Sequence, residues 1–312
     1  MRRALMSWCA VTALATAVVT GCGDSGVGAG DAHGQTRQDT GVRTPALTWR
    51  EEARVNDALQ RLTSRCMGRQ GFVYQEEREL TLQESRPVRF VQDDPAWAEV
   101  YGYGSRIETK SARLRERNVN GTYRQNLPAT RRALFDQALD GGDSARMLTA
   151  PMPGGGEIRK RIGGCTEEAE RTLYGDPAEW FRTSKTALSA NYLYAGRLMK
   201  DPQLTAAVRG WSACMREAGE PYPDPQAAQD GVRAAAVRRG AARADESFAA
   251  ERRTAVADAG CARRTRLRAV ATAREKHYLD HLPDRYVKDI DTYRRLGRQA
   301  YDRAVRIVPE RD

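Results

Sequence analysis

The chain has 312 residues, of which 40% are hydrophobic and 29% are charged, and its formal net charge is +10 at neutral pH. This length is sufficient for one large domain or two small ones. Arg is mixed with Asp and Glu along the chain, as at Arg50-Glu51-Glu52. Mixed signs of this kind are typical of solvated helix faces and argue against one large basic binding patch.

The first residues have the layout of a secretory signal peptide. A short positive start at Arg2-Arg3 precedes an uncharged, apolar run over 4–20. That run is shorter than the roughly 20 apolar residues a membrane-spanning helix needs. We therefore predict a signal peptide over 1–21, whose removal leaves a net charge of +8. Residues 22–45 are rich in Gly, Ser, Asp and Thr and are predicted to form a flexible tether.

The end of the apolar run, Val19-Thr20-Gly21-Cys22, resembles the bacterial lipobox. The resemblance implies cleavage before Cys22, a diacylglycerol on its thiol and acylation of the new N-terminus. Two or more acyl chains hold a protein stably on a bilayer. We expect a lipid-anchored protein on the outer face of the cell membrane, exported by the general secretory route and without nucleic-acid partners. An ordinary signal peptide with an incidental Cys22, or an uncleaved anchor, remains the alternative.

Apolar residues recur at helical spacing through most of the remaining chain, and alternating patterns are almost absent, so the expected fold is mostly α. Residues 72–125 are expected to form a loop-rich insertion, with one short helix near 96–100. Residues 147–156 are expected to form a Pro- and Gly-rich loop. Helices are predicted over 48–67, 125–139, 157–174, 177–199, a stretch opened by Asp201-Pro202, 226–240, 247–282 and 286–307.

Four cysteines remain once Cys9 has left with the signal peptide and Cys22 carries lipid. An even number in an exported protein favours two disulfides, and four cysteines allow three pairings. Metal ligation or redox chemistry is the alternative role, although the chain has no CxxC pair. These four cysteines are Cys66, Cys165, Cys214 and Cys261.

The cysteines lie in repeated contexts. A Cys-Met-x-x-x-Gly element occurs at 66–71 and again at 214–219, and a Gly-Cys pair occurs at 164–165 and at 260–261. The chain is therefore predicted to hold two copies of one helical plan, and the simplest pairing joins Cys66 to Cys165 and Cys214 to Cys261. The predicted copies span 46–200 (copy 1, containing the insertion 72–125) and 201–312 (copy 2, with long C-terminal helices).

These elements carry a family resemblance. The lipobox, the two Cys-Met elements, Tyr101-Gly102-Tyr103-Gly104, Gly163-Gly164-Cys165 and the segment 256–267 resemble a group of actinobacterial secreted lipoproteins to which no activity is assigned. The resemblance covers most of the mature chain. Some small actinobacterial lipoproteins act as immunity proteins or as sensors of envelope stress, and the resemblance implies roles of that kind.

A non-catalytic binding, sensing or immunity-type module is therefore the expected function, with an envelope protein or a peptide as partner. Tyr and Arg are favoured in binding surfaces, and four such residues in the insertion are the candidate contacts. Filling of the core between Ala-rich helices is the other explanation for the aromatic residues. We expect no enzyme activity and no cofactor, since the chain has neither a Gly-x-Ser-x-Gly elbow nor a nucleotide loop. The candidate contacts are Tyr101, Tyr103, Arg106 and Tyr123.

A metal-handling envelope protein is the alternative function. His277 and His281 are four residues apart on a predicted helix, so both imidazoles face the same way and could hold zinc or copper. The residues between them lack the Glu of an HExxH hydrolase motif. A site would need a third ligand from elsewhere in the fold. Two ordinary helix-surface residues remain the other interpretation.

Overall fold

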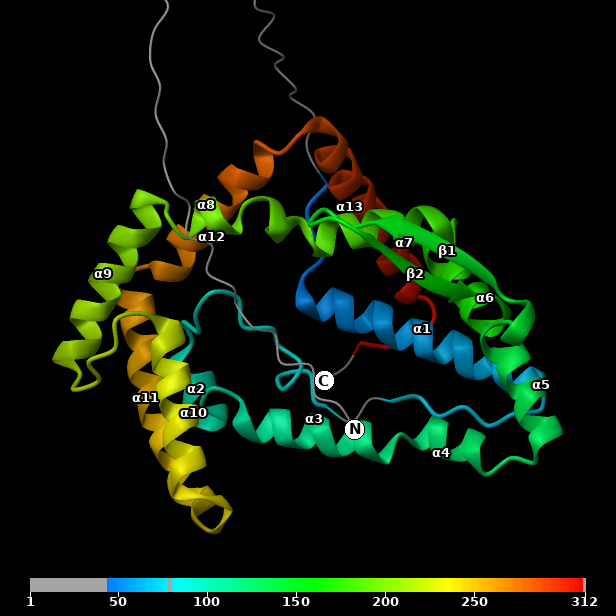
Figure 1. Ribbon diagram of the computed structural model, residues 1–312, viewed down its shortest axis with the longest axis horizontal. Coiled ribbons are helices and arrows are strands. Elements are labelled where there is room, and N and C mark those ends of the chain that lie inside the picture. The colour runs from blue at the N-terminus through cyan, green and yellow to red at the C-terminus, as the bar shows by residue number, and fades with distance from the viewer. Residues whose placement is uncertain (1–43, 78–79, 311–312) are drawn as a thin grey trace, which may run out of the picture. The chain divides into compact units, whose positions relative to one another are not determined.

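The computed structural model describes residues 44–77 and 80–310, and these residues belong to one compact unit (Figure 1). These residues are mostly helical with one short hairpin, which confirms the predicted fold class. The predicted signal peptide, Cys22 and nearly all of the predicted tether lie outside the described residues. Among those described, no helix combines the length and apolarity needed to cross a bilayer.

The longer elements follow the chain in a simple order, with the hairpin in the middle. In sequence they are α1 (Trp49–Arg69), α2 (Pro95–Tyr101), α3 (Ser105–Arg117), α4 (Val119–Gln125), α5 (Ala129–Asp140), β1 (Arg146–Pro151), β2 (Glu157–Ile162), α6 (Gly164–Tyr174), α7 (Pro177–Leu188), α8 (Ala195–Leu198), α9 (Pro202–Glu217), α10 (Pro225–Arg239), α11 (Ala244–Arg264), α12 (Leu267–Asp280) and α13 (Asp284–Ala304). Three short 3₁₀ turns lie at 142–144, 190–193 and 241–243.

Local sequence explains where many helices begin. Thr48 and Glu51 form a reciprocal capping box at the start of α1, where each side chain accepts a hydrogen bond from the other residue's backbone N–H. Four other helices begin with the same Asp-Pro pair. The Asp side chain accepts hydrogen bonds from the first turn, and Pro occupies a position whose N–H would have no helical partner. These helices are α2, α7, α9 and α10.

Both predicted disulfides are present, with Cα–Cα distances of 5.5 Å for Cys66–Cys165 and 5.6 Å for Cys214–Cys261. Each staples two helices of the same copy, as the repeated sequence contexts predicted. Loops of 99 and 47 residues are closed in this way. Closing loops of that length stabilises the fold by about 4 kcal/mol each in the chain-entropy description.

The repeat is also visible in backbone geometry. Ser64 donates its hydroxyl proton to the carbonyl of Tyr74 at 2.7 Å, and Ser212 does the same to Tyr222 at 2.8 Å. After each helix the repeated Gly adopts a positive φ, of 75° at residue 71 and 81° at residue 219. The burial of residues 63–67 and 211–215 matches position by position. The two Cys-Met elements are therefore one structural unit used twice.

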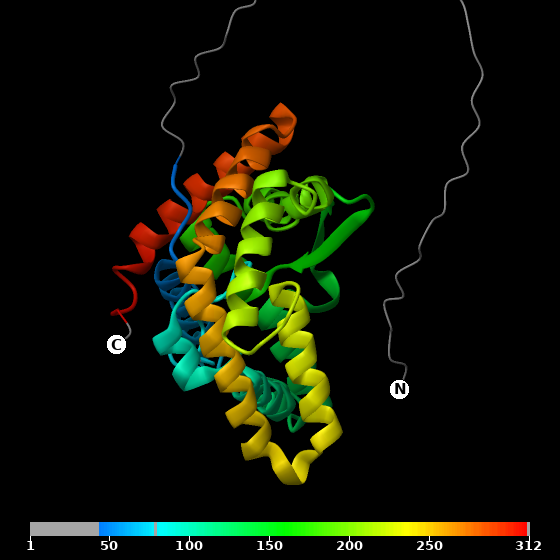
Figure 2. The ribbon, with the colours of Figure 1, turned by 90° about the vertical axis from the view of Figure 1, so that its left-hand side faces the viewer.

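The two predicted copies pack into one compact unit instead of forming separate domains. The last helix of copy 2, α13, packs against α7, α1 and α6 of copy 1. In the opposite sense, α2 of copy 1 packs against α11 of copy 2, and α11 in turn lies beside α10 (Figure 2). One apolar cluster accordingly joins Val55 and Leu173 of copy 1 with Ala300 and Val308 of copy 2.

The hairpin corrects two predictions, since residues 157–162 form a strand instead of the start of a helix and the expected Pro/Gly loop contains β1. The strands pair antiparallel, with Ala150 opposite Ile158. Residues 158, 160 and 162 face inward in alternation. This alternation of inward-facing and outward-facing side chains is hard to recognise in the sequence, because charged residues occupy most positions of so short a strand. The loop between the strands contains Gly155 and Gly156, both with positive φ.

Three further predictions differ from the structure. The predicted single helix over 177–199 ends at Leu188 and is followed by the 3₁₀ turn at 190–193 and the short helix α8. The predicted single helix over 247–282 is broken at Arg266, which has a left-handed φ of 55° and separates α11 from α12. No Gly or Pro marks this break, so the sequence pattern gave no sign of it. In the insertion, only 72–94 is irregular. Its second half begins with α2, which confirms the short helix predicted near 96–100. The unpredicted helices α3 and α4 follow, and they bury no residue fully, so their sequences carry little apolar pattern to recognise.

The insertion is fastened to copy 2 by ion pairs. Arg89 lies 2.5 Å from Glu275 of α12, and Asp93 lies 2.6 Å from Arg268 of the same helix. Glu275 also accepts a hydrogen bond at 2.6 Å from Tyr194. Because Glu275 is largely buried, these contacts hold the irregular segment more firmly than exposed ion pairs would.

The Tyr101-Gly102-Tyr103-Gly104 stretch forms the turn between α2 and α3, wrapped around the buried carboxylate of Glu251. Glu251 accepts hydrogen bonds from the backbone N–H of Tyr103 at 2.8 Å and of Ser105 at 3.1 Å. It thereby supplies the N-terminal cap that α3 lacks in its own sequence. Gly102 has φ +61°, and a Cβ there would lie 2.7 Å from the Glu251 Oε1 atom.

We predict that Gly102→Ala destabilises the protein by about 3 kcal/mol or more, because the added methyl group strains the backbone and displaces Glu251 from its donors. Gly104→Ala is the matched control: its φ is also positive, but a Cβ meets nothing closer than 4.0 Å. It should cost about 1–2 kcal/mol. Urea unfolding followed by circular dichroism measures both. Equal losses would contradict the role given to Glu251.

Candidate functional site: a cleft between α1 and α3

The predicted contact residues Tyr101, Tyr103 and Arg106 lie around the α2–α3 turn. Tyr101 packs against Trp97 with ring centroids 4.9 Å apart. Tyr103 is partly buried and donates its hydroxyl proton to Asp258 at 3.1 Å. Arg106 lies over the Phe248 ring at 3.8 Å and pairs with Asp245 at 2.7 Å. Their observed contacts are with the protein itself, mainly α11.

Tyr123 belongs to a different part of the fold. Its ring centroid lies 5.9 Å from that of Phe135, in the apolar cluster around the Cys66–Cys165 disulfide. Its hydroxyl accepts a hydrogen bond from the backbone of Val73 at 3.4 Å. The structure therefore brings three of the four predicted contacts together and places the fourth in a separate cluster.

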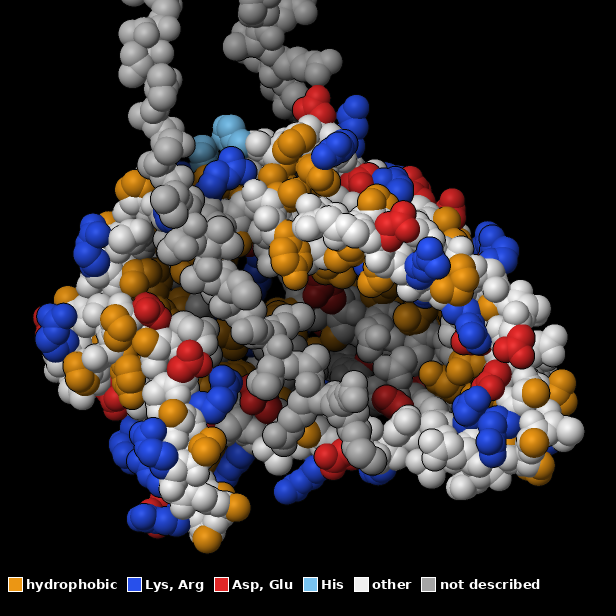
Figure 3. Space-filling view, in the orientation of Figure 1, with side chains coloured by type: hydrophobic (Ala, Val, Ile, Leu, Met, Phe, Trp, Pro, Cys, Tyr) orange, Lys and Arg blue, Asp and Glu red, His pale blue; other side chains and the backbone are white. Residues whose placement is uncertain are grey.

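The insertion does form a cleft, although with other residues. A cavity of about 530 Å³ lies between α1 and the segment 77–115. Trp49, Glu52 and Asn56 project into it from α1, and Ser111 and Arg115 do so from α3. In Figure 1, α3 runs on the opposite side of this space from α1, and Figure 3 shows basic and acidic side chains interspersed over the visible face of the molecule. Its volume lies within the range of small-molecule sites.

An aromatic pocket of about 240 Å³ adjoins the cleft. Glu52 and Asn56 line both cavities, so the two meet along this face of α1. One wall of the pocket is a stack of three rings, in which Trp180 lies 3.8 Å from Tyr174 and 5.0 Å from Tyr293. Such rings offer an apolar surface with polar edges.

The neighbouring carboxylates Glu51 and Glu52 have different surroundings. Glu51 is paired with Arg298 at 2.5 Å, and the pKa of Glu51 is lowered chiefly by that hydrogen bond. The Glu52 side chain is exposed, but nearby protein atoms partly desolvate its carboxylate and so raise its pKa; Arg89 opposes this by attraction, and Glu51 adds a like charge. Within the described residues Glu52 has no hydrogen bond or ion pair through its side chain, and neither has Arg115 across the cleft.

A buried polar network supports the α3 wall from behind. Asp258 of α11 is fully buried and accepts hydrogen bonds from the Trp211 indole N–H at 2.8 Å and the Tyr103 hydroxyl at 3.1 Å. Burial raises the pKa of Asp258 to about 7, although both hydrogen bonds act to lower it. Burial beside Asp258 likewise raises the pKa of Tyr103. This network joins the α2–α3 turn to α9 and α11.

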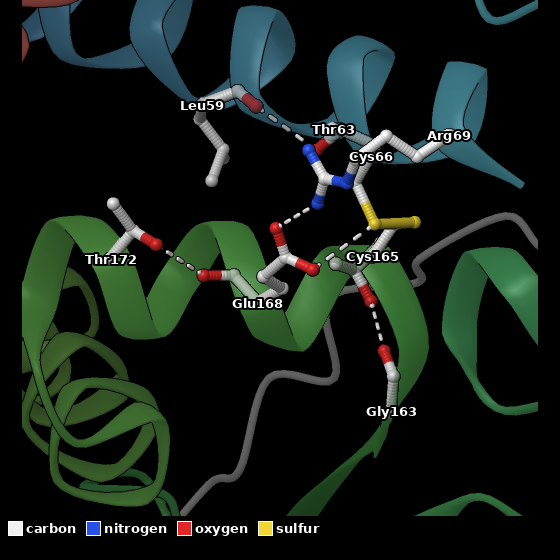
Figure 4. Close-up of a disulfide and its surroundings, with 9 residues drawn as sticks. Leu59, Thr63, Cys66, Arg69, Gly163, Cys165, Glu168 and Thr172 are labelled. Atoms are coloured by element: carbon white, nitrogen blue, oxygen red, sulfur yellow. Dashed lines mark hydrogen bonds and ion pairs between the residues drawn. A yellow bond between two sulfur atoms is a disulfide. The ribbon is translucent and has the colours of Figure 1, made fainter.

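The Cys66–Cys165 disulfide links the end of α1 to the start of α6 (Figure 4). Glu168 lies between Arg69, with which it forms an ion pair, and the sulfur of Cys66, which is 3.4 Å from its carboxylate. The hydroxyl groups of Thr63 and Thr172 donate hydrogen bonds to backbone carbonyls one turn earlier in their own helices. Both sulfurs are buried, and the bridge fixes the position of the C-terminal half of α1.

His277 and His281 lie at the exposed end of α12, with ring centroids 4.3 Å apart. The Nδ1 atom of His281 lies 2.6 Å from the carbonyl of His277, so this imidazole caps the helix C-terminus. In the part of the chain that the structure describes, no group of three or more His, Cys, Asp or Glu residues is placed to hold a metal ion. The third ligand that the metal hypothesis needs is therefore not found among the described residues.

Sequence reasoning missed the residues that line the cleft. In the sequence, Glu52 belongs to a run of mixed charges that indicates a solvated helix face, and Arg115 falls in the segment 72–125, which is predicted to be loop-rich. Nothing local distinguishes either residue, because their shared feature is that they face one cavity from helices far apart in sequence. For aromatic residues such as Tyr174 and Trp180, the sequence leaves ligand binding and core filling as alternative explanations. Comparison with protein-family models, with curated proteins and with solved structures finds no match to this chain.

We predict that stability depends on pH through Asp258. Its pKa is raised above the unfolded value of 3.8, so the folded state holds a proton that the unfolded state loses as the pH rises from about 4 to 7. This group therefore lowers stability progressively over that interval, and the loss is complete above pH 7. Asp258→Asn keeps the network neutral. Its stability relative to the unaltered protein should rise by on the order of 3 kcal/mol between pH 5 and pH 8.

Urea unfolding of both proteins at several pH values measures this difference. Groups with lowered pKa values, such as Asp94 and Asp136, contribute equally to the two proteins and cancel. A difference that stays constant with pH would contradict the assignment of a proton to Asp258.

Proposed function

We propose that this protein is a lipid-anchored, extracytoplasmic and non-catalytic binding module whose ligand occupies the cleft between α1 and α3. The observation that carries the proposal is the cleft itself, about 530 Å³ in volume and open to an aromatic pocket along α1. Its walls combine apolar surface with a few charged and polar groups, which is the usual composition of ligand sites. The two disulfides suit a protein that works outside the cytoplasm.

The location is proposed from the sequence alone. The signal-peptide layout, the lipobox at Cys22 and the resemblance to actinobacterial lipoproteins all favour export and anchoring. The polar segment from residue 23 to 44 is long enough to hold the folded unit away from the bilayer. A cleft in such a unit would meet molecules of the cell envelope.

The anchor has a direct test. With the protein expressed in an actinobacterium supplied with labelled palmitate, we expect label in the unaltered protein and its recovery with membranes. Cys22→Ser should abolish the label, because the acceptor thiol is gone. Cys9→Ser, which removes a cysteine of the predicted signal peptide, is the matched control and should retain it. An unlabelled native protein, or a labelled Cys22→Ser variant, would refute the anchor.

The cleft has a separate test. Purified protein is incubated with the low-molecular-weight fraction of a cell-envelope extract, washed by ultrafiltration and analysed for retained molecules by mass spectrometry. Ala53→Trp fills the cleft from α1 and should abolish retention. Ala213→Trp places the same side chain at an exposed position of α9 and should leave retention unchanged. Retention of nothing by the unaltered protein, or equal retention by Ala53→Trp, would overturn the proposed site.

A further inference from the structure

The charges of the cleft indicate what kind of ligand it takes. Glu52 stands on the α1 wall and Arg115 on the α3 wall. Both side chains are exposed, and within the described residues neither has a direct ion-pair partner, although Arg89 attracts Glu52 at longer range. The third charged group that lines the cleft, Glu77, accepts a hydrogen bond from Asn120 at 3.3 Å. One carboxylate and one guanidinium thus face the cavity from opposite walls, too far apart to pair with each other.

Two opposed and unpaired charges are complementary to a ligand that carries both signs at its two ends. A carboxylate binds an ammonium group, and a guanidinium binds a carboxylate through two parallel hydrogen bonds. Such contacts are strongest where protein atoms displace water. The Glu52 side chain is exposed in the empty cleft, so a ligand that fills the cleft would itself displace water from this carboxylate. An ammonium group placed there would add a direct charge-assisted hydrogen bond to the longer-range attraction that Glu52 has to Arg89.

The aromatic pocket indicates a third feature of the ligand, an apolar group close to its ammonium. It opens beside Glu52 and Asn56, and it is lined by Leu59, Trp180 and Tyr293 among others. A group attached next to the ammonium would therefore enter an apolar pocket of about 240 Å³. In a peptide, the side chain of the first residue is the group in that position.

We propose that the cleft binds a short free peptide with an apolar first residue, whose N-terminal ammonium pairs with Glu52 and whose C-terminal carboxylate pairs with Arg115. The first side chain occupies the aromatic pocket, and the remaining backbone lies along the cleft beside Asn56 and Ser111. This inference rests on the proposed function and specifies its ligand. Both ends of the peptide must be free, which distinguishes it from an internal segment of a protein.

The test uses Leu-Gly-Gly as the probe, and binding is followed by isothermal titration calorimetry. N-acetylation or C-amidation of the probe should each weaken binding about tenfold or more, since each removes one charge-assisted contact. Gly-Gly-Gly should bind about tenfold more weakly than Leu-Gly-Gly, because it leaves the aromatic pocket empty.

Variants of the two charged residues assign each contact. Glu52→Gln should weaken binding of the free peptide about tenfold but leave binding of the acetylated peptide unchanged. Arg115→Gln should likewise weaken binding of the free peptide and leave binding of the amidated peptide unchanged. Glu116→Gln and Arg113→Gln alter exposed residues of α3 outside the cleft and serve as controls. Circular dichroism confirms that each variant is folded.

Three results would overturn the inference. They are no binding of Leu-Gly-Gly at about 10 mM, equal binding of blocked and free peptides, or losses of affinity that add up when a variant is combined with the peptide blocked at the matching end. If envelope extract still yields a molecule whose retention Ala53→Trp abolishes, the cleft remains a ligand site and only the peptide assignment fails. If nothing is retained either, both proposals fail together.

Discussion

Two buried carboxylates on α11, Glu251 and Asp258, hold the rest of the site in place. They are seven residues apart and so lie on the same face of the helix. Glu251 caps the first turn of α3, and Asp258 binds Tyr103 and the Trp211 indole. A buried carboxylate without such donors would be strongly destabilising, so the α2–α3 turn and α11 require each other. Because this turn fixes the start of α3, it also fixes one wall of the cleft.

The cleft therefore depends on both copies, although all the residues that line it belong to copy 1. Copy 1 supplies α1 and the insertion, and copy 2 supplies the surfaces that hold the insertion away from α1. Glu251 secures the turn before α3, while Arg89 and Asp93 tie the preceding irregular segment to α12. A copy 1 expressed alone would lack all of these anchors. The packing of the two copies against each other is thus a condition for the cavity as well as for stability.

The features that sequence predicted are those with a local signal. The Cys-Met elements at 66–71 and 214–219 predicted the disulfide pairing, since the repeat selects one pairing out of three. Helical spacing predicted α1 and most of the later helices. The break at Arg266 and the strand at 157–162 depend on tertiary packing, and α3 has almost no apolar stripe. The cleft could not be predicted for a similar reason, because Glu52 and Arg115 come to line one cavity only when the whole insertion is folded.

The two copies differ in the path of the chain after the repeated Cys-Met element, and this difference explains why the cleft beside α1 lies in copy 1. In each copy a Ser hydroxyl binds the Tyr carbonyl ten residues later and directs the chain away from the helix end. After Tyr222 the chain enters α10 within three residues, and α10 packs directly on α11. After Tyr74 it instead runs through 20 residues to α2 and returns along α3. The same turn is thus followed by a packed helix pair in copy 2. In copy 1 it is followed by the insertion, which forms one wall of the cleft and leaves room for a ligand.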